Sequence, residues 1–142
     1  MAVKRVSPEE ARDLIEKDGW LYVDVRSAPE FEAGHPTGAY NVPLLHRGPG
    51  GMSPNPDFLP TMEKTFPRDA KIVVGCQSGG RSLQAASMLL AAGYGSVVDQ
   101  RAGFGGTVGP GGRPEPGWGP KGLPTSRTAE PGRSFEELRS RG

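Results

Sequence analysis

The only cysteine of this 142-residue chain, Cys76, directly follows a β-branched apolar run at residues 72–74 and a glycine. A helical pattern begins six residues later, at Ser82. A thiol between a buried strand and a helix N-terminus meets backbone N–H groups and the positive end of the helix dipole, which together favour an anion. We therefore predict that Cys76 is a reactive thiol whose surroundings stabilise the thiolate. A buried structural thiol is the alternative.

The loop that follows the cysteine has the composition of an anion cradle. Four residues separate Cys76 from Arg81, and they are Gln77, Ser78, Gly79 and Gly80. The two glycines let the backbone curl tightly and point several N–H groups inward. These donors would stabilise the thiolate and any negatively charged group that the sulfur carries next. Arg81 would add a cation for an anionic substrate.

Alternating hydrophobic patterns predict the elements that position this loop. Strands are expected over residues 3–6, 20–25, 38–42, 72–75 and 96–99. One helix is expected from the capping box at Ser7 to Gly19, and a second from the capping box at Ser27 to Gly34. Further helices are expected over residues 57–66 and 82–92, and after Ser134. Residues 44–56 are expected to form a loop.

Because strands alternate with helices, we predict an α/β domain with a central, mostly parallel, five-stranded sheet and helices on both faces. Ligand sites in such sheets lie beyond the carboxyl ends of the strands. Cys76 lies at one such end, and Asp24 and Arg26 lie at another. Arg26 and Glu30 are four residues apart across a turn, and we expect them to pair and hold the corner between strand and helix.

Glycine and proline make up 14 of the 22 residues from Gly103 to Pro124. No regular element is expected to persist at this density. The sequence therefore predicts a catalytic domain over residues 1–107 and a Gly/Pro-rich extension over residues 108–142. The extension either wraps the domain or is loosely attached, and Trp118 is expected to anchor it.

Charge and composition exclude several classes of function. The net charge is +1 and the pI is about 7.9, so no basic surface indicates a nucleic-acid partner. No apolar stretch is long enough to cross a membrane. Two distant histidines and one cysteine have no metal-ligand spacing, so we expect no metal. A single cysteine forms no internal disulfide, which favours a reducing, cytoplasmic location.

Further motifs resemble the single-domain rhodaneses, the thiosulfate sulfurtransferase family. The resemblance runs over residues 5–106 and is carried by Val23-Asp24-Val25-Arg26, Glu30-Phe31, Gly34-His35-Pro36, residues 38–43 and 73–76, Arg81-Ser82 and residues 89–94. Trp118 followed by Gly122-Leu123-Pro124 is similar to the closing motif of the family. Ala102-Gly103 and Gly105-Gly106 are two alternative candidates for its glycine pair.

The resemblance implies that Cys76 takes a sulfane sulfur from a donor such as thiosulfate and holds it as a persulfide. Cyanide or a thiol would then remove it, without any cofactor. The N–H groups of residues 77–81 and the Arg81 side chain would cradle the persulfide, and Asp24, Arg26 and Glu30 would support the site. Gln77 and Ser78 are uncharged, so a preference for thiosulfate itself does not follow.

Two alternatives use the same residues. The domain could be a carrier or interaction module that receives sulfur from one relay protein and delivers it to another. It could also be a cysteine phosphatase, but the loops of those enzymes are one residue longer, which widens the cradle for a tetrahedral phosphate. The shorter loop favours a terminal sulfur.

Overall fold

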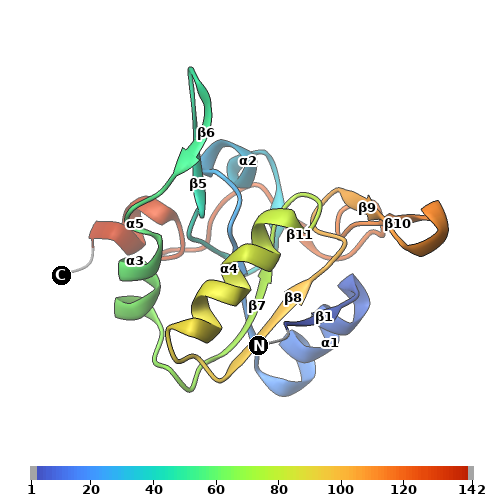
Figure 1. Cartoon of the computed structure of the whole chain (residues 1–142), viewed down its shortest axis with the longest axis horizontal. Helices are drawn as coiled ribbons and strands as arrows, with labels where there is room; N and C mark the ends of the chain where they lie inside the picture. The colour runs from blue at the N-terminus through green and yellow to red at the C-terminus, as the bar shows by residue number, and fades with distance from the viewer. Residues whose placement is uncertain (1–2, 141–142) are drawn as a thin grey trace.

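A five-stranded parallel sheet lies at the centre of the computed structural model, which describes residues 3–140 (Figure 1). The strand order is β1-β8-β7-β2-β4, and every neighbouring pair is parallel. The strands are β1 (Lys4–Val6), β2 (Leu21–Asp24), β4 (Tyr40–Asn41), β7 (Lys71–Gly75) and β8 (Ser96–Gln100). The predicted α/β fold is confirmed, and the sheet is wholly rather than mostly parallel.

Helices cover both faces of this sheet, as predicted. The helices α3 (Phe58–Thr65), α4 (Gly80–Ala91) and α5 (Phe135–Ser140) pack on the face that carries Ile72 and Val74. The helix α1 (Pro8–Asp18) packs on the other face, together with Phe31 of α2 (Ala28–Ala33). Val73 points to this second face, because side chains alternate along a strand. Both faces are therefore apolar, which explains the unbroken hydrophobic runs of β2 and β7.

The capping signals place the N-terminal helices correctly. Ser7 and Glu10 form a complete capping box at the start of α1, and Gly19 ends that helix in the left-handed conformation with φ 72°. The helix α3 tolerates Pro60 because the proline lies in its first turn, where the N–H group needs no helical partner. Local side-chain chemistry is therefore sufficient to set these boundaries.

The expected loop over residues 44–56 is instead a β-hairpin, which projects from the molecule in Figure 1. Its strands are β5 (Leu45–Gly48) and β6 (Gly51–Pro54). Gly51 has φ 101°, a conformation that suits glycine at the turn. The prediction was wrong because β6 is exposed along its length and has no apolar alternation to reveal it.

The Gly/Pro-rich segment also contains regular structure, contrary to expectation. A hairpin joins β9 (Gly106–Val108) and β10 (Pro114–Pro116) around the 3-10 helix η1 (Pro110–Gly112). Further on, β11 (Thr125–Ser126) pairs with β3 (His35–Pro36). Low intrinsic propensity was overridden because an antiparallel partner strand supplies the hydrogen bonds.

The extension after residue 107 contributes to both cores of the domain. Trp118 and Leu123 lie in the core on the α1 face, and Phe135 and Leu138 lie in the core on the α4 face. The Trp118 indole N–H donates a 2.7 Å hydrogen bond to the carbonyl of Pro124. The expected boundary between residues 107 and 108 falls inside β9.

Candidate functional site

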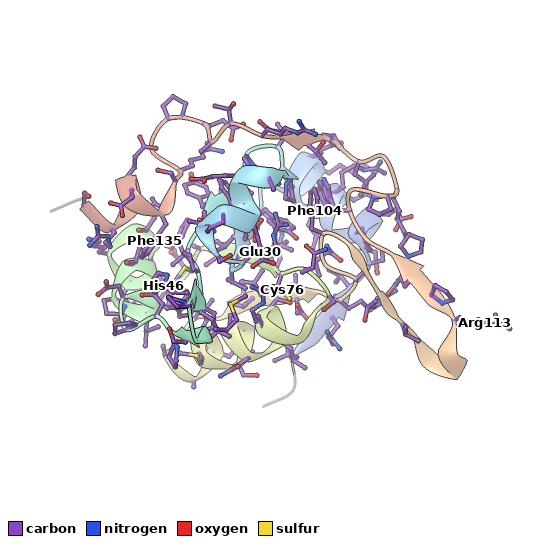
Figure 2. All side chains as sticks on the ribbon, turned by 90° about the horizontal axis from the view of Figure 1, so that it is seen from above. Glu30, His46, Cys76, Phe104, Arg113 and Phe135 are labelled. Carbon is purple, nitrogen blue, oxygen red and sulfur yellow. The ribbon has the colours of Figure 1, made fainter. Side chains whose placement is uncertain are left out.

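Three neighbouring strands end at the same edge of the sheet, and each brings a polar residue there. Asp24 ends β2, Cys76 follows β7, and Asp99 lies near the end of β8. The strand registers pair Asp24 with Gly75 and Val74 with Asp99. Figure 2 shows Cys76 and Glu30 in the body of the molecule, and Arg113 far away on the β9–β10 hairpin. This edge is the place where a parallel sheet normally binds its ligand.

The Cys76 thiol is 2% exposed and lies inside the curl of its loop. The Gly79 N–H group donates a hydrogen bond to Sγ over 3.0 Å, and the Ser82 hydroxyl oxygen lies 3.4 Å from Sγ. Gly79 has φ 98°, and a Cβ atom there would overlap the carbonyl oxygen of Arg101. Only glycine can therefore bring this N–H group to the sulfur.

A second segment supports the loop from behind. The N–H groups of Phe104 and Gly105 donate to the carbonyls of Cys76 and Gln77 over 2.7 and 3.0 Å. A Cβ atom at Gly103 would overlap the backbone of Gln77, so the close approach requires this glycine, whereas a Cβ atom at Gly105 would meet the side-chain amide of Gln77. The structure thus places both candidate glycine pairs of the family motif along this segment.

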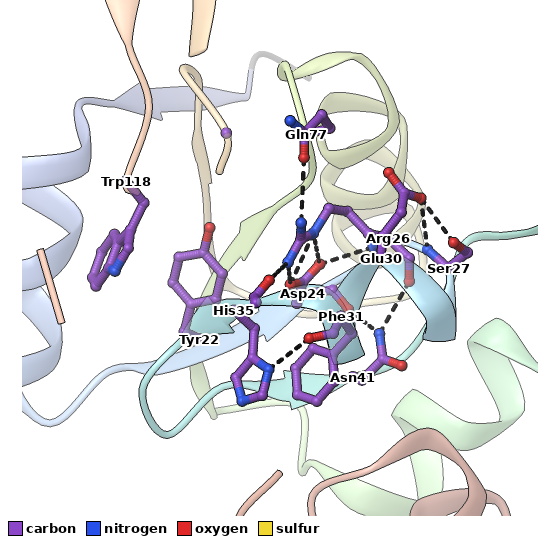
Figure 3. A network of polar contacts seen from close by, with 12 residues as sticks. Tyr22, Asp24, Arg26, Ser27, Glu30, Phe31, His35, Asn41, Gln77 and Trp118 are labelled. Carbon is purple, nitrogen blue, oxygen red and sulfur yellow. Dashed lines mark hydrogen bonds and ion pairs between the residues drawn. The ribbon is translucent and has the colours of Figure 1, made fainter. Parts of the chain in front are cut away.

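A buried ion pair between Asp24 and Arg26 forms the floor beside the loop (Figure 3). The Arg26 guanidinium donates to both carboxylate oxygens of Asp24, with a shortest distance of 2.7 Å. It also donates to Oε1 of Gln77 over 3.2 Å and to the carbonyl of Gly34, and it lies 4.5 Å from the ring centre of Phe104. Arg26 therefore connects the end of β2 to the cysteine loop.

Glu30 pairs with Arg81 and not with Arg26, so the expected Arg26–Glu30 pair was wrong. The two hydrogen bonds between Arg81 and Glu30 are 2.7 and 3.0 Å long. Asp24, only two residues before Arg26, occupies that guanidinium, while the capping box of α2 turns Glu30 towards α4. Arg81 is thereby held beside the loop, and its role towards an anionic substrate stays a prediction.

The Glu30 carboxyl group is ionised far below neutral pH. Burial alone would raise its pKa, but hydrogen bonds from Arg81 and Ser27 outweigh burial and lower the pKa from 4.5 to about 2. A carboxyl group whose pKa is lowered by folding stabilises the protein above its unfolded pKa. This stabilisation is lost as the pH falls from 4.5 towards about 2.

A Glu30→Gln protein should therefore be about 2 kcal/mol less stable at neutral pH, with allowance for the partial exposure of the pair. The difference from the natural chain should shrink as the pH falls from 4.5 towards about 2. Urea unfolding at a series of pH values measures it. Glu32→Gln, on the exposed side of the same helix, is the control. A difference that is constant with pH would contradict the prediction.

Three polar residues near the thiol escaped the sequence analysis as site residues: Arg5, Ser82 and Asp99. Ser82 donates to Asp99, and Arg5 donates to Asp99 over 2.6 Å and to the carbonyl of Gly79 over 3.1 Å. The sequence did contain one indication that Asp99 belongs to the site, namely its position near the carboxyl end of a predicted strand. This indication alone could not place Asp99 near Cys76, because that requires the strand order, which puts β8 directly beside β7.

A cleft of about 620 Å³ opens on the outer side of the loop. It is lined by loop residues 78–80, by Leu83 of α4 and by the β9–β10 hairpin. At its edge, Arg101 binds Glu115 of the hairpin with hydrogen bonds of 3.0 and 2.9 Å. Cys76 is not part of the lining, so the cleft borders the loop and does not contain the sulfur.

Within residues 3–140, no group of three histidine, cysteine or acidic side chains is placed to hold a metal ion. No helix in the same range has the length and apolar character needed to span a membrane.

The comparisons with known proteins agree with this fold. The family model of the rhodanese-like domain matches residues 7–106, and the chain belongs to that family. Thiosulfate sulfurtransferase 16, chloroplastic, of Arabidopsis thaliana is 44% identical over 120 residues, which cover 84% of this chain and 90% of that protein.

Two further relatives extend the comparison. The senescence-associated protein DIN1 of Raphanus sativus is 43% identical over 94 residues, which cover 66% of this chain but only 51% of that protein. The crystal structure of Rv0390 from M. tuberculosis superimposes with a TM-score of 0.74 at 25% identity, covering 90% of this chain and all of that one. The matched segment therefore spans nearly all of the first and the third of these proteins and about half of DIN1.

Proposed function

We propose that this chain is a sulfurtransferase that carries a sulfane sulfur on Cys76 as a persulfide. The observation that carries the proposal is the 3.0 Å hydrogen bond from the Gly79 N–H group to Sγ, inside a four-residue loop that ends at Arg81. The sulfur is thereby oriented by a backbone donor at the start of α4, where negative charge is favoured. The 44% identity to a protein named a thiosulfate sulfurtransferase supports the same activity.

The proposed reaction has two displacements. In the first, the Cys76 thiolate attacks the outer sulfur of thiosulfate; the S–S bond breaks, and sulfite leaves with the electron pair. In the second, cyanide or a thiolate attacks the outer sulfur of the persulfide, and Cys76 leaves as a thiolate. The Gly79 N–H group would stabilise the negative charge on Sγ before the first step and after the second.

The partners of this reaction are a small anionic donor and a thiol or cyanide acceptor, which could also be carried by a protein of a sulfur relay. The word chloroplastic in the name of the Arabidopsis relative applies to that protein. For this chain, the cytoplasmic location stays a prediction.

The intact mass of the protein tests the persulfide directly. Incubation with thiosulfate should add one sulfur atom to the natural chain, and subsequent cyanide should remove it. The Cys76→Ser protein should gain nothing under the same conditions. Absence of a gain with thiosulfate, mercaptopyruvate and a protein persulfide would contradict the proposal.

A further inference from the structure

A continuous polar chain leads from the proposed nucleophile into the protein. The Cys76 thiol lies 3.4 Å from the Ser82 hydroxyl oxygen and can donate its proton to it. The Ser82 hydroxyl in turn donates to Oδ1 of Asp99 by a short hydrogen bond. The Gly79 carbonyl, 3.4 Å from the same hydroxyl, is a more distant acceptor. The natural direction of donation is therefore from the thiol through the serine to the carboxylate.

All three members of this chain are shielded from solvent. Ser82 and Asp99 are fully buried, and Cys76 is 2% exposed. Burial raises the pKa of Asp99 above its usual value of 3.8, although hydrogen bonds from Ser82 and Arg5 oppose this effect. The aspartate is thus a better proton acceptor than an exposed carboxylate.

The remaining charged and titratable groups around the thiol and Asp99 have partners of their own. Arg5, from β1, binds Oδ2 of Asp99 over 2.6 Å and leaves Oδ1 to Ser82. The others are Tyr22 and Asp24 of β2, Arg26 after it, and Arg81 of α4 with its partner Glu30 of α2. None of these groups is hydrogen-bonded to Sγ, so among the described residues Ser82 offers the side-chain route for the proton.

We infer that Ser82 and Asp99 form a proton relay that converts the Cys76 thiol into its thiolate and later returns the proton. The thiol proton moves to Ser82 Oγ while the hydroxyl proton of Ser82 moves to Oδ1 of Asp99. The result is a thiolate that accepts a hydrogen bond from Ser82, beside a neutral carboxylic acid. No electron is transferred, and the net charge of the site is unchanged.

Ser82 and Asp99 have different roles in catalysis, and these roles rest on the proposed sulfur transfer. Ser82 contacts the reacting sulfur and donates to it when Cys76 leaves as a thiolate. Asp99 acts through Ser82 and stores the proton away from solvent. The relay would keep the charge of the site constant, so a dianionic donor could approach without an additional negative charge.

A relay predicts a particular pH dependence of thiol reactivity. When Asp99 takes up the thiol proton in an appreciable fraction of the molecules, no proton has to leave the site for solvent, and the thiolate fraction changes little across neutral pH. Without a buried acceptor, the thiol must lose its proton to solvent, and reactivity rises about tenfold per pH unit below its ionisation. The slope of the logarithm of the rate against pH therefore distinguishes the two cases.

The experiment measures the rate of Cys76 alkylation by iodoacetamide against pH, followed by intact mass. The natural chain should show a plateau across neutral pH. Asp99→Asn should replace this plateau with the tenfold rise per pH unit, and Ser82→Ala should lower it at least about tenfold. Ser82→Thr, which keeps a hydroxyl group, should restore part of the rate.

Two matched variants serve as controls. Ser87→Ala, on the exposed side of α4, and Asp13→Asn, on the exposed side of α1, should both retain the plateau. Thermal unfolding identifies any relay variant that fails to fold. The ultraviolet absorbance of the thiolate, compared with that of Cys76→Ser at each pH, gives a second measurement that needs no access to the sulfur.

Profiles of the natural chain and Asp99→Asn with the same slope would overturn the relay. The alkylation assay requires no sulfur donor, so it remains valid if the protein forms no persulfide. Failure of the relay and failure of the proposed sulfur transfer are thereby distinguishable.

Discussion

A Cys76→Ser protein should transfer sulfur from thiosulfate to cyanide at least about a thousandfold more slowly than the natural chain. A serine hydroxyl is a much poorer leaving group than a thiol, and an alkoxide is not available at neutral pH. The fold should survive, because the smaller oxygen fits the same position and can still accept from the Gly79 N–H group. Turnover should therefore fall without loss of thermal stability.

The measurement is the formation of thiocyanate under steady-state conditions. The Ser87→Ala protein, changed on the exposed side of α4, should retain full turnover and is the control. Unchanged turnover in Cys76→Ser would remove the persulfide mechanism. Slow turnover of the natural chain with thiosulfate, combined with fast exchange with a protein persulfide, would favour the carrier. Hydrolysis of an aryl phosphate that depends on Cys76 would favour the phosphatase.

The substitution Trp118→Ala, in the Gly/Pro-rich extension, should destabilise the protein by about 3–5 kcal/mol. Trp118 is 3% exposed and contacts Tyr22 edge-on with ring centres 5.5 Å apart. Its removal would leave a cavity against the sheet and would also remove the hydrogen bond to Pro124. Because the total stability of a small domain is about 5–15 kcal/mol, the loss of this one side chain of the extension would remove a large part of it.

Urea unfolding measures this loss of stability. Trp20→Ala is a matched control, since Trp20 packs at the margin of the same core and is only partly buried. Trp20→Ala should lower the free energy of unfolding clearly less than Trp118→Ala does. Equal unfolding midpoints for Trp118→Ala and the natural chain would show that the tail is only loosely attached. That result would favour a loosely attached extension over one that wraps the domain, the two possibilities that the Gly/Pro composition leaves open.

Local signals in the sequence are sufficient for most elements and for the position of the thiol. The capping boxes at Ser7 and Ser27 depend on side chains three residues from their backbone partners, so they can be recognised without a fold. The same holds for the apolar run before Cys76 and the glycines after it, which together predict a strand, a tight loop and a helix. The α/β class follows from the alternation of these elements.

Tertiary structure decided the partners of the charged residues. Arg81 and Glu30 are 51 residues apart, and Arg5 and Asp99 are 94 residues apart. The sequence suggested the nearer Arg26–Glu30 pair, because spacing along the chain is its only measure of distance. β1 lies beside β8 with Arg5 in register with Asp99, and the fold brings Arg81 of α4 to Glu30 of α2, so these contacts select the true partners.

In the Gly/Pro-rich extension, too, local sequence predicts little and tertiary contacts decide the structure. The glycines and prolines of residues 103–124 carry little preference of their own, so the sequence predicted only that no regular element would persist there. Pairing with β3, packing of Trp118 on Tyr22 and burial of Leu138 against the body supply the missing stabilisation. These contacts exist only once the sheet has formed, because the residues that make them belong to segments far apart in the chain.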